Sequence, residues 1–196
     1  RPLAEVKISE LARAAGVSQA TFFNYFPTKG DLLAHFIQLW SLQVGVVARD
    51  ALAEQGSALA SIEALFEATA ARTAKNPAVT LEIIACHAQQ PLDITLAPIE
   101  LAERLLFLPE EPDVEALSDE GLTGVLPRLL ALAVEQGELP GTADIDQLTL
   151  ATASVFFTVP LLFARTEPER LGSLYRQQLQ LVWAAARSPE LQEAKP

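Results

Sequence analysis

The chain is poor in the residue types that most often build reactive sites. Its 196 residues include one cysteine, two histidines and no methionine. With Cys86 as its one cysteine, the chain can form no internal disulfide, so a reducing, cytoplasmic location is expected. A chain without an initiator methionine is also expected to be less than the complete translation product.

Catalytic constellations are missing as well. Cys86 and His87 are neighbours, and neighbours on a helix point about 100° apart, which argues against a nucleophile and base pair. Glu82 and Cys86 share a helical face, yet two ligands do not make a metal site. No glycine-rich phosphate loop is present. We therefore expect no enzyme activity, no metal and no cofactor.

Long uninterrupted apolar runs are also lacking. The longest, Leu148 to Ala164, contains four hydroxyl residues and Pro160. This pattern favours a buried or interface helix over a membrane span. The N-terminus has no apolar signal-peptide core. We expect neither secretion nor a membrane partner.

The sequence pattern along the whole chain is typical of helices. Half of its residues are hydrophobic, enough for a sizeable core, and alternating strand patterns are absent. The predicted fold is all-α, with breaks at proline and glycine. The expected helices are 8–15, 19–25, 29–54, 58–75, 78–90, 118–136, 144–165 and 168–187, with shorter pieces between 91 and 112.

The most informative stretch is ISELARAAGVSQATFFNYF, residues 8–26. It predicts two short helices joined at Gly16, which can take the left-handed conformation that ends a helix. Ser18 is placed to cap the second helix, and Phe26-Pro27 to end it. This is the pattern of a helix-turn-helix DNA reader.

The second helix divides its side chains between two faces. Phe22 and Phe26 would pack inward, leaving Gln19, Ala20, Phe23 and Asn24 outward. Asn24 can make a bidentate pair with adenine, Gln19 can do the same, and Ala20 permits close approach to base edges. The hydroxyls of Ser18, Thr21 and Tyr25, with Lys29 at the start of the next helix, suit phosphate oxygens. From these residues alone, an ordinary helix pair with an exposed aromatic patch remains an alternative.

Charge is distributed unevenly along the chain. Residues 1–30 carry four basic and two acidic side chains, a net +2, within a chain whose net charge is −11. Residues 31–196 therefore carry −13. A basic end on an acidic body suits a protein that touches phosphate at that end only.

The segment ISELARAAGVSQATFFNYFPTKGDLLAHFI closely resembles the DNA-binding region of TetR-family transcriptional regulators. The matching positions are Ile8, Leu11, Ala12, Ala15–Ser18, Thr21, Phe22, Tyr25, Phe26, Lys29, Leu32 and Leu33. The resemblance implies a homodimer that represses transcription from a palindromic operator in double-stranded DNA until a small molecule releases it. It implies base contacts from Gln19, Ala20 and Asn24, and phosphate contacts from Ser18, Thr21, Tyr25 and Lys29.

The chain departs from the family pattern at three points. Phe23 stands where tyrosine is usual, so one phosphate-binding hydroxyl is lost. Lys7 stands where threonine often caps the first helix. The family also has a further helix before this segment, and we expect Phe22, Phe26 and Phe36 to lack packing partners without it.

The resemblance divides the chain into an incomplete DNA-binding module, residues 1–36, and a helical domain for effector binding and dimerisation, residues 37–196. It implies a pocket among the middle helices, for an apolar or amphipathic effector judged from the wall composition. The expected lining residues are Phe66, Glu82, Cys86, His87, Gln90, Phe107 and Phe156, with Asp93 as a further polar candidate.

The last two long helices are the expected dimer surface. The helix at 148–163 is apolar nearly all round, and the last helix carries a second apolar stripe. Two such helices from each subunit would form a four-helix bundle. The expected interface residues are Leu150, Phe157, Leu161, Leu174, Gln178, Leu181 and Val182. The remaining alternative to a regulator is a helical ligand-binding or scaffold protein that no longer binds DNA.

Overall fold

The computed structural model describes residues 3–89, 99–117 and 120–188, and within these ranges every regular element is a helix. The all-α prediction is confirmed. The α-helices are α1 (Ile8–Ala14), α2 (Gln19–Tyr25), α3 (Lys29–Gln55), α4 (Ala58–Lys75), α5 (Pro77–Gln89), α6 (Leu101–Phe107), α7 (Gly121–Glu135), α8 (Ile145–Phe163) and α9 (Leu171–Arg187). Short 3-10 turns lie at Leu3–Glu5, Val114–Ala116 and Pro168–Arg170.

Side-chain caps set the starts of several helices where the sequence predicts them. Ser18 accepts a hydrogen bond from the Thr21 amide at the start of α2. Thr28 and Asp31 form a reciprocal capping box at the start of α3. Asp144 caps α8 in the same way as Ser18 caps α2. Local chemistry therefore fixes these boundaries.

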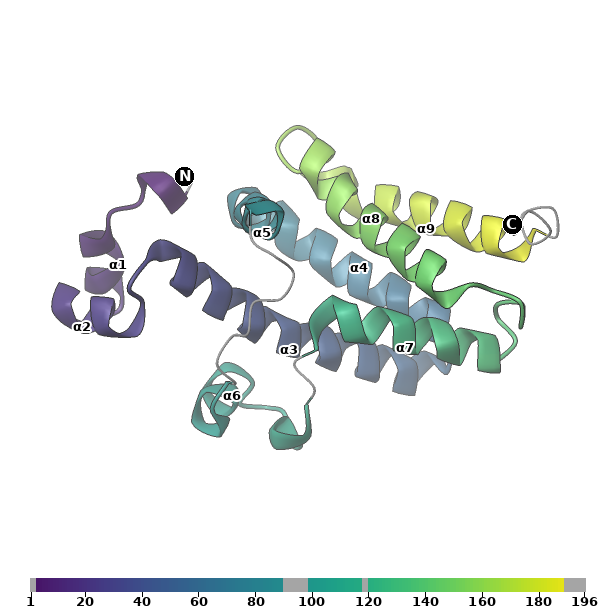
Figure 1. Cartoon of the computed structure of the whole chain (residues 1–196), viewed down its shortest axis with the longest axis horizontal. Helices are drawn as coiled ribbons and strands as arrows, with labels where there is room; N and C mark the ends of the chain where they lie inside the picture. The colour runs from purple at the N-terminus through teal and green to yellow at the C-terminus, as the bar shows by residue number, and fades with distance from the viewer. Residues whose placement is uncertain (1–2, 90–98, 118–119, 189–196) are drawn as a thin grey trace.

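Helix α4 lies at the centre of the larger domain, packed against α3, α7 and α9 (Figure 1). An aromatic cluster joins it to the last helices: the Phe66 ring meets those of Phe156 and Tyr175 edge-on, at 5.2 and 5.0 Å. The buried Tyr175 hydroxyl donates to the Phe156 carbonyl at 2.8 Å. This core ties α4, α8 and α9 into one unit.

The N-terminal helices α1 and α2 lie at one end of the molecule, joined to the rest through α3 (Figure 1). The predicted domain boundary after residue 36 falls inside α3, which continues from the small module into the core. The two parts therefore share one continuous helix.

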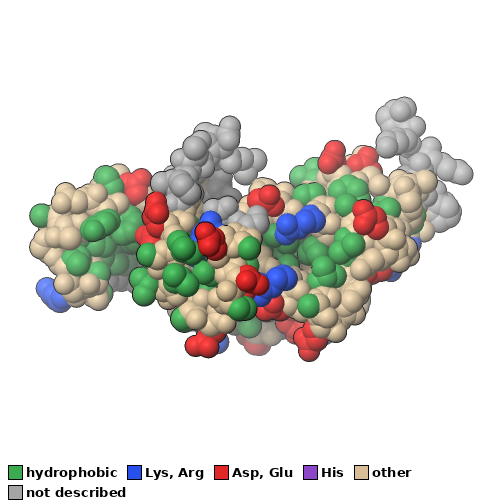
Figure 2. Space-filling model, turned by 90° about the horizontal axis from the view of Figure 1, so that it is seen from below, with side chains coloured by type: hydrophobic (Ala, Val, Ile, Leu, Met, Phe, Trp, Pro, Cys, Tyr) green, Lys and Arg blue, Asp and Glu red, His purple; other side chains and the backbone are tan. Residues whose placement is uncertain are grey.

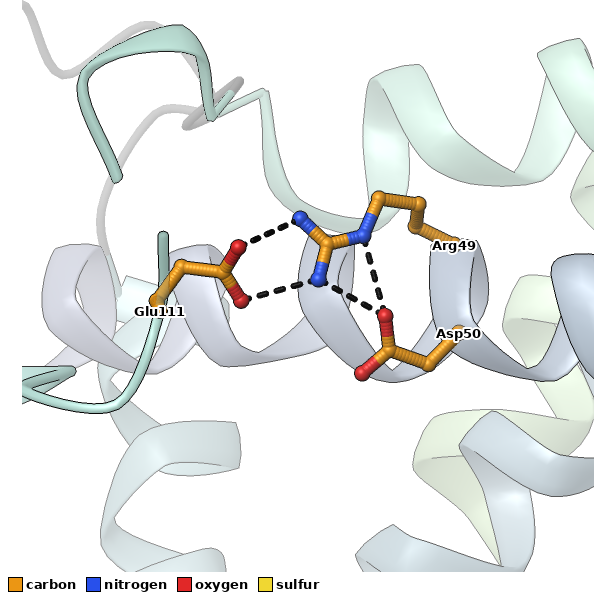
Figure 3. A network of polar contacts seen from close by, with 3 residues as sticks. All are labelled: Arg49, Asp50 and Glu111. Atoms are coloured by element: carbon orange, nitrogen blue, oxygen red, sulfur yellow. Dashed lines mark hydrogen bonds and ion pairs between the residues drawn. The ribbon is translucent and has the colours of Figure 1, made fainter. Parts of the chain in front are cut away.

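An ion-pair network holds the segment after α6 against α3 (Figure 3). The Arg49 guanidinium binds both carboxylate oxygens of Glu111, at 2.7 and 2.8 Å, and also contacts Asp50 at 2.7 Å. These bonds raise the pKa of Arg49 and lower the pKa of Glu111. A bidentate pair of this kind fixes orientation as well as charge.

The expectation about membrane-spanning helices needs a correction. By length and composition alone, α3 and α8 are apolar enough to cross a membrane. The core helix of a soluble protein and an N-terminal signal sequence pass the same test, so this is weak evidence for a membrane span. The hydroxyl residues of α8 do not make it polar enough to fail that test.

Candidate DNA-binding and effector-binding sites

The turn between α1 and α2 has the geometry that the sequence predicts. Gly16 has a φ of +68°, and the Val17 amide donates to the Ala12 carbonyl at 3.0 Å. Ala12 and Phe22 are buried between the two helices. At the start of α1, Lys7 occupies the cap position and makes no side-chain cap, as its replacement of threonine predicts.

The outward face of α2 is open to solvent. Gln19, Ala20 and Asn24 are exposed, as is Phe23, and Tyr25 is 75% exposed. A helix that presents small and amide side chains without neighbouring cover can enter a major groove. The structure thus leaves the residues predicted to face bases accessible together on one short helix.

The residues predicted to contact phosphate are partly engaged within the protein. The hydroxyl oxygens of Ser18 and Thr21 lie 2.8 Å apart and share a hydrogen bond. The Lys29 ammonium donates to the Leu3 carbonyl at 2.9 Å. Lys29 therefore ties the N-terminal segment to α3 in this state, a contact that sequence reasoning missed.

The three phenylalanines expected to lack partners each have one. Phe22 is buried, and its ring lies 5.6 Å from that of Phe26. The Phe26 ring lies 5.6 Å from that of His35 on α3. The Arg72 guanidinium lies over the Phe36 ring at 5.4 Å. These contacts come from the end of α2, from α3 and from α4.

A cavity of about 460 Å³ lies between the core and the module. Its volume falls in the usual range for small-molecule sites. Its lining residues are Leu3, Leu32, Leu33, Phe36, Trp40, Thr69, Arg72, Thr73, Asn76, Val79, Thr80, Ile83, Ile84, Phe156, Phe157, Pro160 and Tyr175.

Among the predicted pocket residues whose side chains the structure describes, Phe156 alone lines this cavity. Phe66 lies behind it, fully buried against Phe156 and Tyr175. Phe107 belongs to α6, which projects from the body away from this site (Figure 1). Sequence reasoning found the aromatic cluster but could not tell which of its rings border open space.

The polar pocket candidates on α5 have other surroundings. Glu82 accepts a hydrogen bond from the Leu3 amide at 3.0 Å. Cys86 is half-buried, and burial raises the pKa of its thiol. The side chain of His87, and all of Gln90 and Asp93, lie outside the described residues. The face of α5 that lines the cavity instead carries Val79, Thr80, Ile83 and Ile84.

Sequence reasoning missed Arg72, which lines the cavity from α4. Its guanidinium donates to the Gln43 side-chain oxygen, and burial lowers its pKa. The helical spacing does indicate a shared polar face. Thr69 and Thr73 are four residues apart, and so are Arg72 and Asn76, so these side chains lie on one side of α4. No periodicity of apolar residues marks such a face.

Helices α8 and α9 leave an apolar face uncovered. Leu150, Phe157 and Leu161 follow one another at helical spacing on α8, with Leu150 70% exposed. Leu174, Gln178 and Leu181 do the same on α9, with Leu181 63% exposed, and Val182 lies beside them half-buried. Of the predicted dimer residues, Leu150, Leu161, Gln178 and Leu181 are exposed. The others, Phe157, Leu174 and Val182, are half-buried against the core, and Phe157 also lines the cavity.

Across the described parts of the chain, no group of three or more histidine, cysteine or acidic side chains is arranged to hold a metal ion. Acidic side chains are scattered over the body on the face shown in Figure 2, and the module at its left end shows mainly apolar and neutral atoms.

Residues 1–36 match the family model described as bacterial regulatory proteins, tetR family. Among curated proteins, no sequence matches the chain. Solved structures do match: the chain is similar to Thermus thermophilus FadR, a TetR-family transcriptional repressor solved with lauroyl-CoA. The TM-score is 0.62 and the identity 23%, over 91% of this chain and 84% of that one.

Two further regulators have similar structures. The fatty acid degradation regulator FadR of Bacillus halodurans has a TM-score of 0.66 and 20% identity, over 94% of this chain and 91% of that one. The TetR-family regulator PfmR of Thermus thermophilus has a TM-score of 0.58 and 20% identity, over 93% and 90%. These likenesses extend the match from the N-terminal module to the fold of almost the whole chain.

Proposed function

We propose that this chain, a TetR-family regulator by its N-terminal module and its fold, is a transcriptional repressor released by a small molecule. The observation that carries the proposal is the exposed face of α2, where Gln19, Ala20 and Asn24 stand free of cover after a glycine turn. Phe23, 45% exposed on the same helix, adds apolar surface that a bound partner would cover.

In this proposal α2 enters the major groove. Asn24 and Gln19 pair with base edges, and Ala20 allows the helix to approach them. Ser18, Thr21 and Tyr25 bind phosphate oxygens. Lys29 joins them once it leaves the Leu3 carbonyl that it contacts here.

The apolar face of α8 and α9 supports a homodimer. Leu150, Leu161 and Leu181 are large, exposed and on two adjacent helices. Two copies of this face would close into a four-helix bundle about a two-fold axis. A two-fold dimer presents two α2 helices, so the operator would be a palindrome with half-sites about one helical turn apart.

The effector in this proposal occupies the cavity of about 460 Å³. Its walls are mostly apolar, which suits an apolar or amphipathic molecule. The similar Thermus thermophilus FadR was solved with lauroyl-CoA, and this makes a fatty-acyl compound the first candidate.

Release would act through α3. Leu32, Leu33 and Phe36 line the cavity, and the same helix begins at Lys29, directly after α2. A ligand that prefers a different position of α3 shifts the population away from the DNA-binding arrangement by its difference in affinity for the two.

The proposal is tested by selecting duplexes from a random pool with the full chain. We expect a palindromic sequence to be enriched. We also expect the chain to release duplexes with that sequence when an effector binds. A pool that stays random after repeated rounds contradicts the proposal.

Two observations favour a second candidate, a helical ligand-binding protein that no longer binds DNA. The Lys29 ammonium is held by the Leu3 carbonyl, and Phe23 lacks the usual tyrosine hydroxyl. In that case the same selection would give no palindrome, while ligands would still bind in the cavity.

A further inference from the structure

Arg72 is the one charged side chain among the described residues that line the cavity. Its guanidinium lies over the Phe36 ring, and the other lining residues are mostly apolar, with Thr69, Thr73, Asn76 and Thr80 as the neutral polar ones. A cation is costly to keep in an apolar wall, because it loses hydration that its neighbours do not replace.

Arg72 has no acidic partner within the described parts of the chain. Its polar contact is the neutral Gln43 amide oxygen, and its other contact is the Phe36 ring at 5.4 Å. By comparison, Arg49 binds two carboxylates on the surface. Burial without a counter-ion lowers the Arg72 pKa, whereas pairing raises that of Arg49.

The residues that line the cavity differ in their exposure. Asn76, one turn beyond Arg72 on α4, is exposed, and Val79 is 41% exposed, so the opening lies at these residues. Phe156 and Tyr175 are buried, as is Pro160. Along α4, Arg72 lies between the exposed Asn76 and the buried Phe66, whose ring packs against those of Phe156 and Tyr175.

We propose that this cavity selects anionic amphiphiles, with the negative group bound by Arg72 and the apolar chain lying against the floor formed by Phe156 and Pro160. The inference rests on the proposed effector site and adds a charge requirement to it. A guanidinium offers two parallel N–H donors, which match the oxygens of a carboxylate or a phosphate.

Two sources supply this chemistry: a chain that ends in a free carboxylate, and a chain joined by a neutral thioester to a phosphorylated carrier. In the first, the carboxylate itself meets Arg72. In the second, the carrier leaves through the opening and its phosphates supply the charge. Both kinds of ligand place negatively charged oxygen atoms next to Arg72.

The test compares dodecanoate, lauroyl-CoA and uncharged dodecan-1-ol, titrated into the full chain and followed by tryptophan fluorescence. Trp40 lines the cavity, whereas Trp183 borders a different hollow between α4 and α9, so the change in emission reports on this site. We expect at least one of the two anions to bind about 10-fold or more tightly than the alcohol.

Arg72→Gln should lower the affinity for the preferred anion by about 10- to 100-fold and leave that for the alcohol within about 2-fold. Arg72→Lys keeps the positive charge but loses the two parallel N–H donors of the guanidinium. It should retain part of the preference for anions over the alcohol. The matched control is Arg128→Gln, an exposed arginine on α7 outside the cavity, which should change nothing. Which anion depends on Arg72 identifies the source.

The inference is overturned if the wild-type chain binds the alcohol as tightly as both anions, or binds none of the three. It is also overturned if Arg72→Gln weakens all three equally while its circular dichroism and melting temperature match wild type. The DNA selection tests the proposed function separately. If the selection fails, the repressor proposal is wrong, but the preference of the cavity for anions can still be correct.

Discussion

At the scale of single residues, Asn24 is the sharpest test of base reading. Asn24→Ala should cost about 1–3 kcal/mol in binding to the selected palindrome, because a bidentate pair with adenine is lost. Binding to a scrambled duplex should change little, since that rests on phosphate contacts. Fluorescence anisotropy with both duplexes gives the two affinities.

Gln147→Ala is the control for Asn24→Ala, because Gln147 is an exposed amide in the first turn of α8, far along the chain from the module. If Asn24→Ala weakens both duplexes equally, the assignment of Asn24 to a base edge is wrong.

Ser18 has a structural role beside its proposed phosphate contact. Ser18→Ala removes the cap that accepts the Thr21 amide at 3.0 Å, and should destabilise α2 by about 1 kcal/mol. Hydrogen exchange of the α2 amides should then accelerate about 5-fold, whereas Ser18→Asn, which can still cap, should exchange as wild type does. Equal acceleration in both variants would show that the cap does not stabilise α2.

At the scale of helices, the α8 and α9 face makes a prediction about assembly. Leu161→Glu and Leu181→Glu should each weaken dimerisation by about 2–4 kcal/mol, because a charge would be buried where an apolar side chain packs. Sedimentation equilibrium measures the dissociation constant.

The control for assembly is Leu106→Glu on α6. Leu106 is 83% exposed and just as apolar, but its helix α6 lies away from α8 and α9 (Figure 1), so the dimer should persist. A wild-type chain that sediments as a monomer, or a dimer that survives both α8 and α9 substitutions, contradicts the proposed interface.

The Arg49–Glu111 pair predicts a dependence on pH. The Glu111 pKa is lowered by its bonds to Arg49, so the stabilisation is complete above the ordinary carboxyl pKa and is lost as the pH falls through the lowered value. Carbon-13 NMR of the Glu111 carboxyl should titrate below its ordinary range in wild type, and Arg49→Gln should move the midpoint up. An unchanged midpoint would show that the pair does not form in solution.

Elements governed by local chemistry could be predicted from the sequence, and those governed by distant contacts could not. Gly16, Ser18 and Thr28 act on their immediate neighbours, so the module and the helix starts follow from the chain alone. The cavity depends on which side of α5 faces α3 and α8, a matter of packing between segments far apart. For this reason Phe156 was found and Arg72 was not.

At the scale of the whole molecule, one helix connects the two proposed activities. The start of α3 follows α2 directly, its next two turns line the cavity, and its C-terminal half packs in the core against α4 and α7. The Leu3 segment adds a second link, because its amide binds Glu82 on α5 and its carbonyl binds Lys29 on α3. A ligand in the cavity would contact α3, which follows α2 directly, so its binding could shift α2 through this one helix.

A regulator of this kind should bind DNA, and a titration with the DNA upstream of its own gene measures this binding. The full chain is added to a labelled duplex from the promoter region of its own gene, at several salt concentrations, and anisotropy is recorded. We expect saturable binding, with a log association constant that falls linearly with log salt concentration, with a slope of about 0.9 for each phosphate neutralised. Absence of any salt-dependent binding to this duplex would contradict this expectation.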